Sequence, residues 1–283
     1  MLDEQQLRCV ECYGRLNPEL SCIHCGTRYE RAPSGAPIMM TAADREGYRV
    51  LLDSERGAQM QAIYSQRRSP HWIRKLYPPN PVYVNPSAPP LPASRPGMHL
   101  WIGGAGLDLP GFVNIDVAAV PGVDVVANAA RLPFPPSSFD SIACLALLEH
   151  VPDPDRVVAE MFRALKPGGE TQVVVPFCHP YHAYPADYSR FSRERLSGMF
   201  TDFAEVEIGI RTGPTVTMLT FLTYYVKLIL PIHGGSTIRR NINRLIVGAI
   251  GWTIFPLKYL DIWLNRSPGA DVLANHLYVV ARR

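Results

Sequence analysis

The sequence predicts an α/β fold built on an open, mainly parallel β-sheet. Apolar, β-branched segments such as 171–175 alternate with a helical pattern at 154–165, and this alternation is typical of βαβ units. Glycines and polar residues follow three of the expected strands, where parallel sheets bind ligands. The chain has 283 residues, of which 47% are hydrophobic and 19% are charged, so it is long enough to bury a complete core.

The first element is a cysteine-rich module that we expect to be a zinc ribbon, an appendage to the α/β core. Two Cys-x-x-Cys pairs supply tetrahedral thiolate ligands, and they are Cys9, Cys12, Cys22 and Cys25. Four ligands leave no open position, so we expect a structural Zn²⁺ that provides most of the folding energy of the module. Iron and a disulfide are the alternatives. Acidic residues at positions 3–4 stand where a signal peptide would have its apolar core, which disfavours the disulfide.

Residues 41–96 connect this module, residues 1–40, to the domain expected over 97–283. Their first part is charged and moderately helical. From Pro70 to Pro96 prolines recur so often that a helix or a central strand is excluded. We predict a helical segment and then a semi-extended linker that either wraps the domain or spaces the ribbon from it.

A glycine turn follows the first expected strand of that domain. The apolar run ending at Ile102 leads into Gly103, Gly104 and Gly106. Without side chains, this backbone can turn sharply and approach a ligand closely. A glycine motif alone is weak evidence, so its context decides what it means.

Polar residues end the next two expected strands. Asp116 closes the second, where its carboxylate can accept two hydrogen bonds from a ribose diol, and Asn128 follows the third, where an amide can bind the edge of an adenine ring. Only about ten residues separate the first two strands, too few for a crossover helix. We expect the three strand ends to line one crevice.

A βαβ unit follows. Asp153 and Pro154 start a helix whose apolar positions recur at helical spacing, and we expect it to run through Leu165 and to end at 167–169. The next strand, 171–175, is apolar on both faces, as in a central parallel strand.

The loop after that strand carries candidate catalytic residues. Residues 176–191 include His179, His182 and Asp187. Transfer of a group to an acceptor by in-line displacement requires alignment of the acceptor and, for a hydroxyl, removal of its proton, so either histidine is a candidate base with Asp187 orienting it. An ion pair between Asp187 and Arg190 that merely fixes the turn is the structural alternative.

In order and spacing these segments resemble class I S-adenosylmethionine-dependent methyltransferases, most closely the type 11 group. The matching segments are the glycine turn, 114–116, 127–129, 132–134, 138–140, 148–151 and 165–169. The resemblance implies a Rossmann-like sheet and S-adenosylmethionine as cofactor. The cofactor-binding residues it implies are Gly103, Gly104, Gly106, Asp116, Asn128 and Glu149. Trp101 and Ala105 depart from the pattern, where the family has an acidic residue and a glycine.

Two further resemblances concern the acceptor. The loop at 179–187 resembles His-Pro-x-His-x-Tyr-Pro-x-Asp loops of methyltransferases for glycan or lipid-linked acceptors. The ribbon resembles the short ribbons of activator subunits of RNA and protein methyltransferases. Basic residues are not interleaved with aromatics on a defined face of the ribbon, which argues against nucleic acid as a partner.

An apolar helical insertion, 211–275, separates the last two expected strands, 204–210 and 276–281. Its apolar runs are short of twenty uninterrupted residues or contain charges, so neither is a secure membrane span. From Arg211 onward the chain has nine basic residues and only two acidic ones. This positive charge favours peripheral contact of 214–264 with anionic lipid. A cap over the acceptor pocket and a dimer interface are the alternatives.

The sequence thus predicts a cytoplasmic methyltransferase, peripheral to the inner face of the membrane, that acts on a small-molecule, glycan or lipid-linked acceptor. The alternative outside the enzymes is a non-catalytic scaffold that binds partner proteins through the ribbon and the insertion. Methylation of RNA or of a translation protein is a third, suggested by the ribbon alone.

Overall fold

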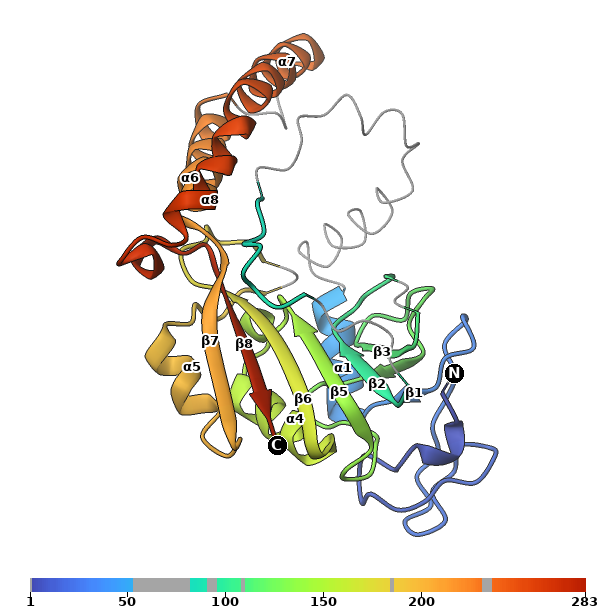
Figure 1. Cartoon of the computed structure of the whole chain (residues 1–283). Helices are drawn as coiled ribbons and strands as arrows, with labels where there is room; N and C mark the ends of the chain where they lie inside the picture. The colour runs from blue at the N-terminus through green and yellow to red at the C-terminus, as the bar shows by residue number, and fades with distance from the viewer. Residues whose placement is uncertain (1, 53–81, 91–95, 108–109, 184–185, 231–235) are drawn as a thin grey trace.

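The computed structural model describes residues 2–52, 82–90, 96–107, 110–183, 186–230 and 236–283 (Figure 1). Its centre is an eight-stranded sheet in the order β1-β4-β3-β2-β5-β6-β8-β7. The strands are β1 (Ile38–Met39), β2 (His99–Ile102), β3 (Phe112–Asp116), β4 (Val125–Ala127), β5 (Phe139–Leu145), β6 (Leu165–Pro176), β7 (Glu205–Thr212) and β8 (His276–Arg282). Only β8 runs against its neighbours. The predicted α/β class and its mainly parallel, Rossmann-like sheet are confirmed.

The helical elements lie between and around these strands. The α-helices are α1 (Ala42–Leu52), α4 (Pro154–Ala164), α5 (Arg193–Met199), α6 (Pro214–Ile229), α7 (Thr237–Ile254) and α8 (Asp261–Leu264). The 3₁₀ turns are η1 (Glu4–Gln6), η2 (Leu148–His150), η3 (Phe255–Leu260) and η4 (Ala270–Leu273). No helix is present in the described part of the connection between β2 and β3, as its length predicts.

Helix α4 packs its apolar face on the centre of the sheet. The Asp153 carboxylate accepts from the backbone N–H of Arg156 (3.0 Å) and caps the helix. Val157 and Met161 are fully buried in the same apolar cluster as Ile142 and Cys144 of β5. The predicted end of this helix is wrong, because Leu165 pairs with Phe139 as the first residue of β6 and the glycines at 168–169 lie within that strand.

The cysteine-rich module is part of the main core, not an appendage. Strand β1 adds to the edge of the sheet beside β4. The backbone N–H of Arg8 donates to Pro133 O (2.9 Å), and Arg131 Nη1 donates to Val10 O (3.0 Å). Leu7 and Cys9 are fully buried in the same apolar cluster as the central strands. Folding of the module and of the sheet edge is therefore coupled.

The described part of the proline-rich linker, 82–90, wraps the domain. Asn85 donates from its backbone N–H to Arg211 O (2.9 Å) and from its side chain to Ile210 O (3.0 Å). The carbonyl of Pro89 accepts from Gln172 and Arg211. These contacts are those of a segment that lies on the domain, while 53–81 and 91–95 lie outside the described residues.

Helices α6, α7 and α8 form the predicted insertion between β7 and β8, and they project from one end of the sheet (Figure 1). Since β7 runs in the same direction as β6, its carboxyl end at Thr212 lies at the ligand-binding edge of the parallel strands. One segment of the described chain, Asn241–Leu264, is long and apolar enough to cross a membrane, with only 6% of it buried. One such segment is weak evidence for a membrane span.

A buried carboxylate holds the insertion to the sheet. Asp261 has no exposed surface, and its oxygens accept from the backbone N–H groups of Thr215 (2.8 Å) and Val216 (3.2 Å) at the start of α6. A Cβ on Gly213 would lie 2.8 Å from this carboxylate, so only glycine fits there. Asp261 thus serves as the cap that the N-terminus of α6 otherwise lacks.

We therefore expect Asp261→Ala to lower the free energy of unfolding by about 2 kcal/mol, because two buried N–H donors lose their acceptor. Thermal unfolding measures the change. Asp271→Ala, which removes an exposed carboxylate paired with Arg193, is the matched control and should cost less than about 1 kcal/mol. Equal effects of the two substitutions would contradict the anchoring role of Asp261.

Candidate functional site

The glycine turn after β2 is held by the side chain of Asn114. Asn114 Nδ2 donates to Ala105 O (2.9 Å) and Gly122 O (2.7 Å) and lies 3.1 Å from Leu107 O. A Cβ on Gly104 would come within 2.3 Å of this amide, so the glycine is needed for the amide to reach the turn. Gly103, with φ +76°, takes the left-handed conformation that glycine tolerates.

Asp116 holds the same turn from the end of β3. Its Oδ2 accepts from the backbone N–H of Ala105 (2.8 Å) and its Oδ1 from that of Ala118 (2.8 Å). Burial raises the pKa of Asp116, and the backbone N–H groups of Ala118, Ala105 and Val117 oppose the shift. A carboxylate has about four lone-pair sites, so beside these three donors at least one site remains open to a ligand.

The structure gives Asn128 a partner that the sequence did not suggest. Asn128 Nδ2 donates to Asp44 Oδ1 on α1 (2.7 Å), while its Oδ1 accepts from the backbone N–H of Ala130 (2.9 Å). Thr41 donates its hydroxyl to the other oxygen of Asp44 (2.7 Å). Helix α1 therefore brings a carboxylate to the third strand end, beside the amide expected there.

The two departures from the family pattern lie beside the turn. Trp101 is buried, and its indole Nε1 has no hydrogen-bond partner among the described residues. Ala105 has φ +46°, a conformation that costs a residue with a Cβ about 1–2 kcal/mol. Its backbone N–H bond to Asp116 offsets part of that strain.

Glu149 stands on η2, directly after β5, and is fully buried. Neither of its carboxylate oxygens has a hydrogen-bond partner among the described residues. Its Oε1 lies 3.8 Å from His150 Nε2 and 3.7 Å from His182 Nε2. The loop after β6 is tied to η2, because Tyr188 N–H donates to Glu149 O (2.7 Å).

Asp187 orders this loop through Arg190. The guanidinium of Arg190 holds both oxygens of Asp187 (2.5 and 2.7 Å) and donates to the carbonyls of His179 and Pro180. Burial opposes ionisation of Asp187, but Arg190 and the backbone N–H of His182 outweigh it and lower the pKa of Asp187 to about 2. The expected ion pair is thus present, and Asp187 also lies 3.7 Å from His182 Nδ1.

Four imidazole rings form a row at this edge. Ring centroids are 5.1 Å apart for His150 and His182, 4.4 Å for His182 and His179, and 5.2 Å for His179 and His276. Burial lowers the pKa of His179, and it lowers that of His276 to about 3, with the charges of the neighbouring groups adding to the effect. Rings with lowered pKa are neutral at pH 7 and can accept a proton.

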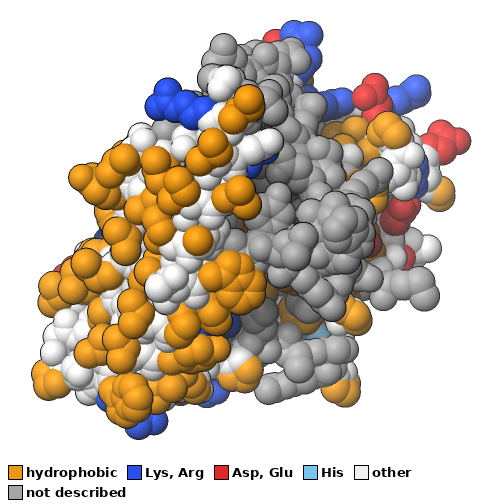
Figure 2. All heavy atoms as spheres, turned by 90° about the horizontal axis from the view of Figure 1, so that it is seen from above, with side chains coloured by type: hydrophobic (Ala, Val, Ile, Leu, Met, Phe, Trp, Pro, Cys, Tyr) orange, Lys and Arg blue, Asp and Glu red, His pale blue; other side chains and the backbone are white. Residues whose placement is uncertain are grey.

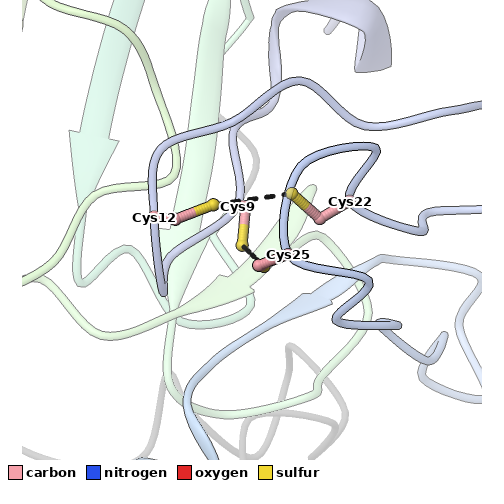
Figure 3. Close-up of side chains that lie close together, drawn as sticks. All are labelled: Cys9, Cys12, Cys22 and Cys25. Atoms are coloured by element: carbon pink, nitrogen blue, oxygen red, sulfur yellow. Dashed lines mark hydrogen bonds between the residues drawn. The ribbon is translucent and has the colours of Figure 1, made fainter.

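The four cysteines of the N-terminal module converge (Figure 3). Sγ–Sγ distances are 3.5 Å for Cys9 and Cys25 and 3.6 Å for Cys12 and Cys22, and all four sulfurs lie within 4.8 Å of one another. Tetrahedral Zn–S bonds of about 2.3 Å place sulfurs about 3.8 Å apart, so the set fits one ion. Hydrogen bonds from Thr27 lower the pKa of the Cys25 thiol to about 6.

The structure therefore brings together most of the predicted site residues in two groups. Gly103, Gly104 and Asp116 form one around the turn, and Glu149, His179, His182 and Asp187 form the other around η2. The sequence did not predict that Asn114 binds the carbonyls of the glycine turn or that Asp44 accepts from Asn128. It also did not predict that His276 joins the row of imidazole rings. The adjacency of Asn114 and Asp116 was a signal for the first, since alternate strand residues share a face.

The proteins that this chain resembles in sequence are methyltransferases. Residues 106–172 match the family described as methyltransferase domain. Over 80 residues the chain is 38% identical to phosphatidylethanolamine N-methyltransferase of Cereibacter sphaeroides, which covers 27% of this chain and 38% of that protein. Over 127 residues it is 43% identical to a ubiquinone/menaquinone biosynthesis C-methyltransferase of Psychromonas ingrahamii, covering 44% and 45%.

A solved structure, phosphoethanolamine N-methyltransferase 2 of Haemonchus contortus in complex with S-adenosyl-L-methionine, matches with a TM-score of 0.40 and 16% identity, covering 69% of this chain and 50% of that one. The matches to both curated relatives span less than half of their length. The family match and the two curated relatives identify methyltransferase sequence in the middle of the chain.

The half-buried His276 makes stability depend on pH. Its pKa of about 3 in the folded chain is below the value of about 6.5 in an unfolded chain. The unfolded state therefore takes up the proton first, and the free energy of unfolding falls by up to about 1.4 kcal/mol per pH unit below 6.5, down to about pH 3. His276→Asn should make urea unfolding less sensitive to pH between 6.5 and 5. An identical pH dependence would contradict this assignment.

Proposed function

We propose that this chain transfers a methyl group from S-adenosylmethionine to a small-molecule, glycan or lipid-linked acceptor at a membrane surface. The observation that carries the proposal is the turn at 103–106, which is held by Asn114 and Asp116. It lies at the same sheet edge as the loop after β6 (residues 176–191), called the histidine loop below. The methyltransferase family match and the methyltransferase relatives support it.

The turn and the neighbouring strand ends fit the cofactor. Asp116 keeps at least one lone-pair site for a ribose diol, and the turn presents backbone without side chains at Gly103 and Gly104. Asn128 and Asp44 provide an amide and a carboxylate at the third strand end, groups that suit the edge of an adenine. Trp101 offers a buried indole N–H, a donor for a carboxylate. When bound, the cofactor supplies an electrophilic methyl group on a sulfonium.

The histidine loop supplies the acceptor side. His179 Nδ1 lies 2.8 Å from the carbonyl of Pro180, and because a carbonyl only accepts, Nδ1 carries the proton and Nε2 is the acceptor. His182 lies beside it, with its backbone N–H on Asp187. These histidines are placed to take the proton of an acceptor hydroxyl, and Asp187 positions them.

The four cysteines would hold a structural Zn²⁺. With all positions taken by thiolates, the ion has no place for a substrate. Because Cys9 and Cys22 are buried in the main core, the ion would stabilise the sheet edge that carries β1 and, through α1, Asp44. We assign the ribbon this supporting role.

The insertion carries the membrane contact. Apolar side chains gather over α6 to α8 (Figure 2), and Leu228 (81%), Ile238 (75%) and Leu245 (75%) have the largest exposed fractions among them. In the described chain these faces are not covered, which disfavours a cap buried on the domain. The excess of basic residues from Arg211 onward favours an anionic lipid surface over a second copy of the same positive chain.

We expect Asp116→Ala to weaken binding of S-adenosylhomocysteine by about 1–3 kcal/mol, because charge-assisted hydrogen bonds to the ribose are lost. Isothermal titration measures the affinity. Asp116→Asn, which keeps an oxygen for the turn, should fall between Ala and wild type. Glu205→Ala, on the exposed outer strand, is the control. Wild-type affinity in Asp116→Ala would remove this residue from the cofactor site.

His182→Ala should lower kcat by about 10²–10⁴-fold, the usual range for a lost general base or its support. The affinity for S-adenosylhomocysteine should stay within about two-fold, because His182 belongs to the acceptor side. Turnover of labelled S-adenosylmethionine with a membrane extract as acceptor source gives the first quantity, and calorimetry the second. Unchanged turnover would exclude His182 from the mechanism.

Wild-type protein should sediment with phosphatidylcholine vesicles that contain phosphatidylglycerol, less so at high salt, because basic residues and apolar faces both contribute. Leu228→Ser with Leu245→Ser should remain in the supernatant. Ile23→Ser, which removes an exposed apolar side chain in the ribbon (69% exposed), is the matched control and should bind as wild type. Binding by the double variant, or concentration-dependent dimers in place of binding, would contradict the membrane assignment.

The same experiments separate the other candidate functions. A scaffold would bind vesicles or proteins but not S-adenosylhomocysteine. Methylation of RNA or of a translation protein would label a nuclease-sensitive or protein fraction and not the lipid fraction. Glu149, whose buried oxygens have no hydrogen-bond partner among the described residues, and the lowered pKa values of His179 and His276 favour the enzyme, since burying such groups is costly without a use.

A further inference from the structure

Among the described residues, Glu149 has a fully buried carboxylate that lacks compensating hydrogen-bond donors. It has no exposed surface, and neither oxygen has a hydrogen-bond partner among the described residues. Taking a carboxylate out of water costs several kcal/mol unless a cation or donors compensate. Some positive species must therefore be supplied at this position.

Two histidines turn their Nε2 atoms toward Glu149, at 3.8 Å from its Oε1 for His150 and 3.7 Å for His182. They come from different elements, His150 from η2 and His182 from the loop after β6. The three ligand atoms lie within 4.8 Å of one another. Ligands about 2.1 Å from a tetrahedral ion are about 3.4 Å apart, so a small contraction closes the set on one ion.

Hydrogen bonds on the far side of each ring set the tautomers. His150 Nδ1 lies 2.6 Å from the carbonyl of Ala186, which only accepts, so Nδ1 carries the proton and the neutral ring has its lone pair on Nε2. His182 Nδ1 lies 3.3 Å from Pro180 O and 3.7 Å from Asp187 Oδ2. Both are acceptors, so the same tautomer follows. Arg190 Nη2 is 3.4 Å from this nitrogen, but its two N–H groups already donate to Pro180 O (2.8 Å) and Asp187 Oδ2 (2.7 Å).

We propose that Glu149, His150 and His182 bind a divalent transition-metal ion. Two imidazole nitrogens and one carboxylate are the ligand set of open zinc, iron and manganese sites, and carbonyl or carboxylate partners on Nδ1 are the usual support of metal-bound histidine. Three protein ligands leave positions for an exogenous oxygen ligand. The site is separate from the four-cysteine cluster, whose ligands are all sulfur.

This inference refines the proposed function at one point. With His182 bound to the ion through Nε2, the proton acceptor of the loop is His179, whose Nε2 stays available. Metal binding itself requires neither cofactor nor acceptor, so it is measured independently of methyl transfer. A chain that transfers methyl groups without this ion, or binds the ion without transfer, separates the two proposals.

The test is titration of Co²⁺ into the full chain after saturation of the cysteine cluster with Zn²⁺. We expect one Co²⁺ per chain, with visible d–d absorption but no sulfur-to-cobalt charge-transfer band. Glu149→Gln and His182→Asn should each weaken the affinity at least ten-fold. His179→Asn, which alters the adjacent ring but no ligand, is the matched control and should bind within about two-fold of wild type. Circular dichroism verifies that each variant is folded.

Three outcomes would overturn the proposal. Failure of the folded wild-type chain to bind Co²⁺ at millimolar concentration would mean that a proton, on Glu149 or on a histidine, compensates the carboxylate. Wild-type affinity in both Glu149→Gln and His182→Asn would place the ion elsewhere. An equal loss in the His179→Asn control would show a disturbed loop in place of a defined ligand set.

Discussion

Two side chains on the same face of β3 give the ligand-binding edge its shape. Asn114 binds the carbonyls of the glycine turn, and Asp116 binds the N–H of Ala105 in that turn. Without them the turn would have to satisfy its own backbone, and Gly104 would have no neighbour that excludes a side chain. The proposed cofactor site depends on this contact, because the nucleoside must lie where the turn leaves its backbone open.

The elements around this edge are connected to parts of the chain that are far away in sequence. The cysteine-rich module supplies β1 and leads to α1, whose Asp44 accepts a hydrogen bond from Asn128. The loop after β6 meets η2 through Tyr188 and His150. The insertion starts from β7 at the same edge, with Asp261 as its anchor. A membrane contact on α6 to α8 would therefore place the acceptor side of the site near lipid.

The sequence predicts the sheet well because strand apolarity, the cap at Asp153 and the glycine turn are local signals. It also predicts the order of the strand ends, hence the grouping of Gly103 with Asp116 and of His182 with Asp187. It could not predict that the cysteine-rich module packs on the sheet edge, that Asn128 binds Asp44, or that His182 approaches Glu149. These contacts join segments that are distant in sequence, and the distance between them in space depends on the whole fold. The end of α4 was wrong because pairing of Leu165 with Phe139 overrode the local preference of the chain.

The central claim is that the edge formed by β2, β3 and β4 binds the nucleoside of a sulfonium methyl donor. A crystal structure of the full chain grown with S-adenosylhomocysteine tests it most directly. The account predicts both ribose hydroxyls within hydrogen-bonding distance of the Asp116 carboxylate, with the turn at 103–106 against the ligand and its adenine beside Asn128. A ligand bound elsewhere, or an edge filled by side chains of the protein with Asp116 directed only at its own backbone, would contradict it.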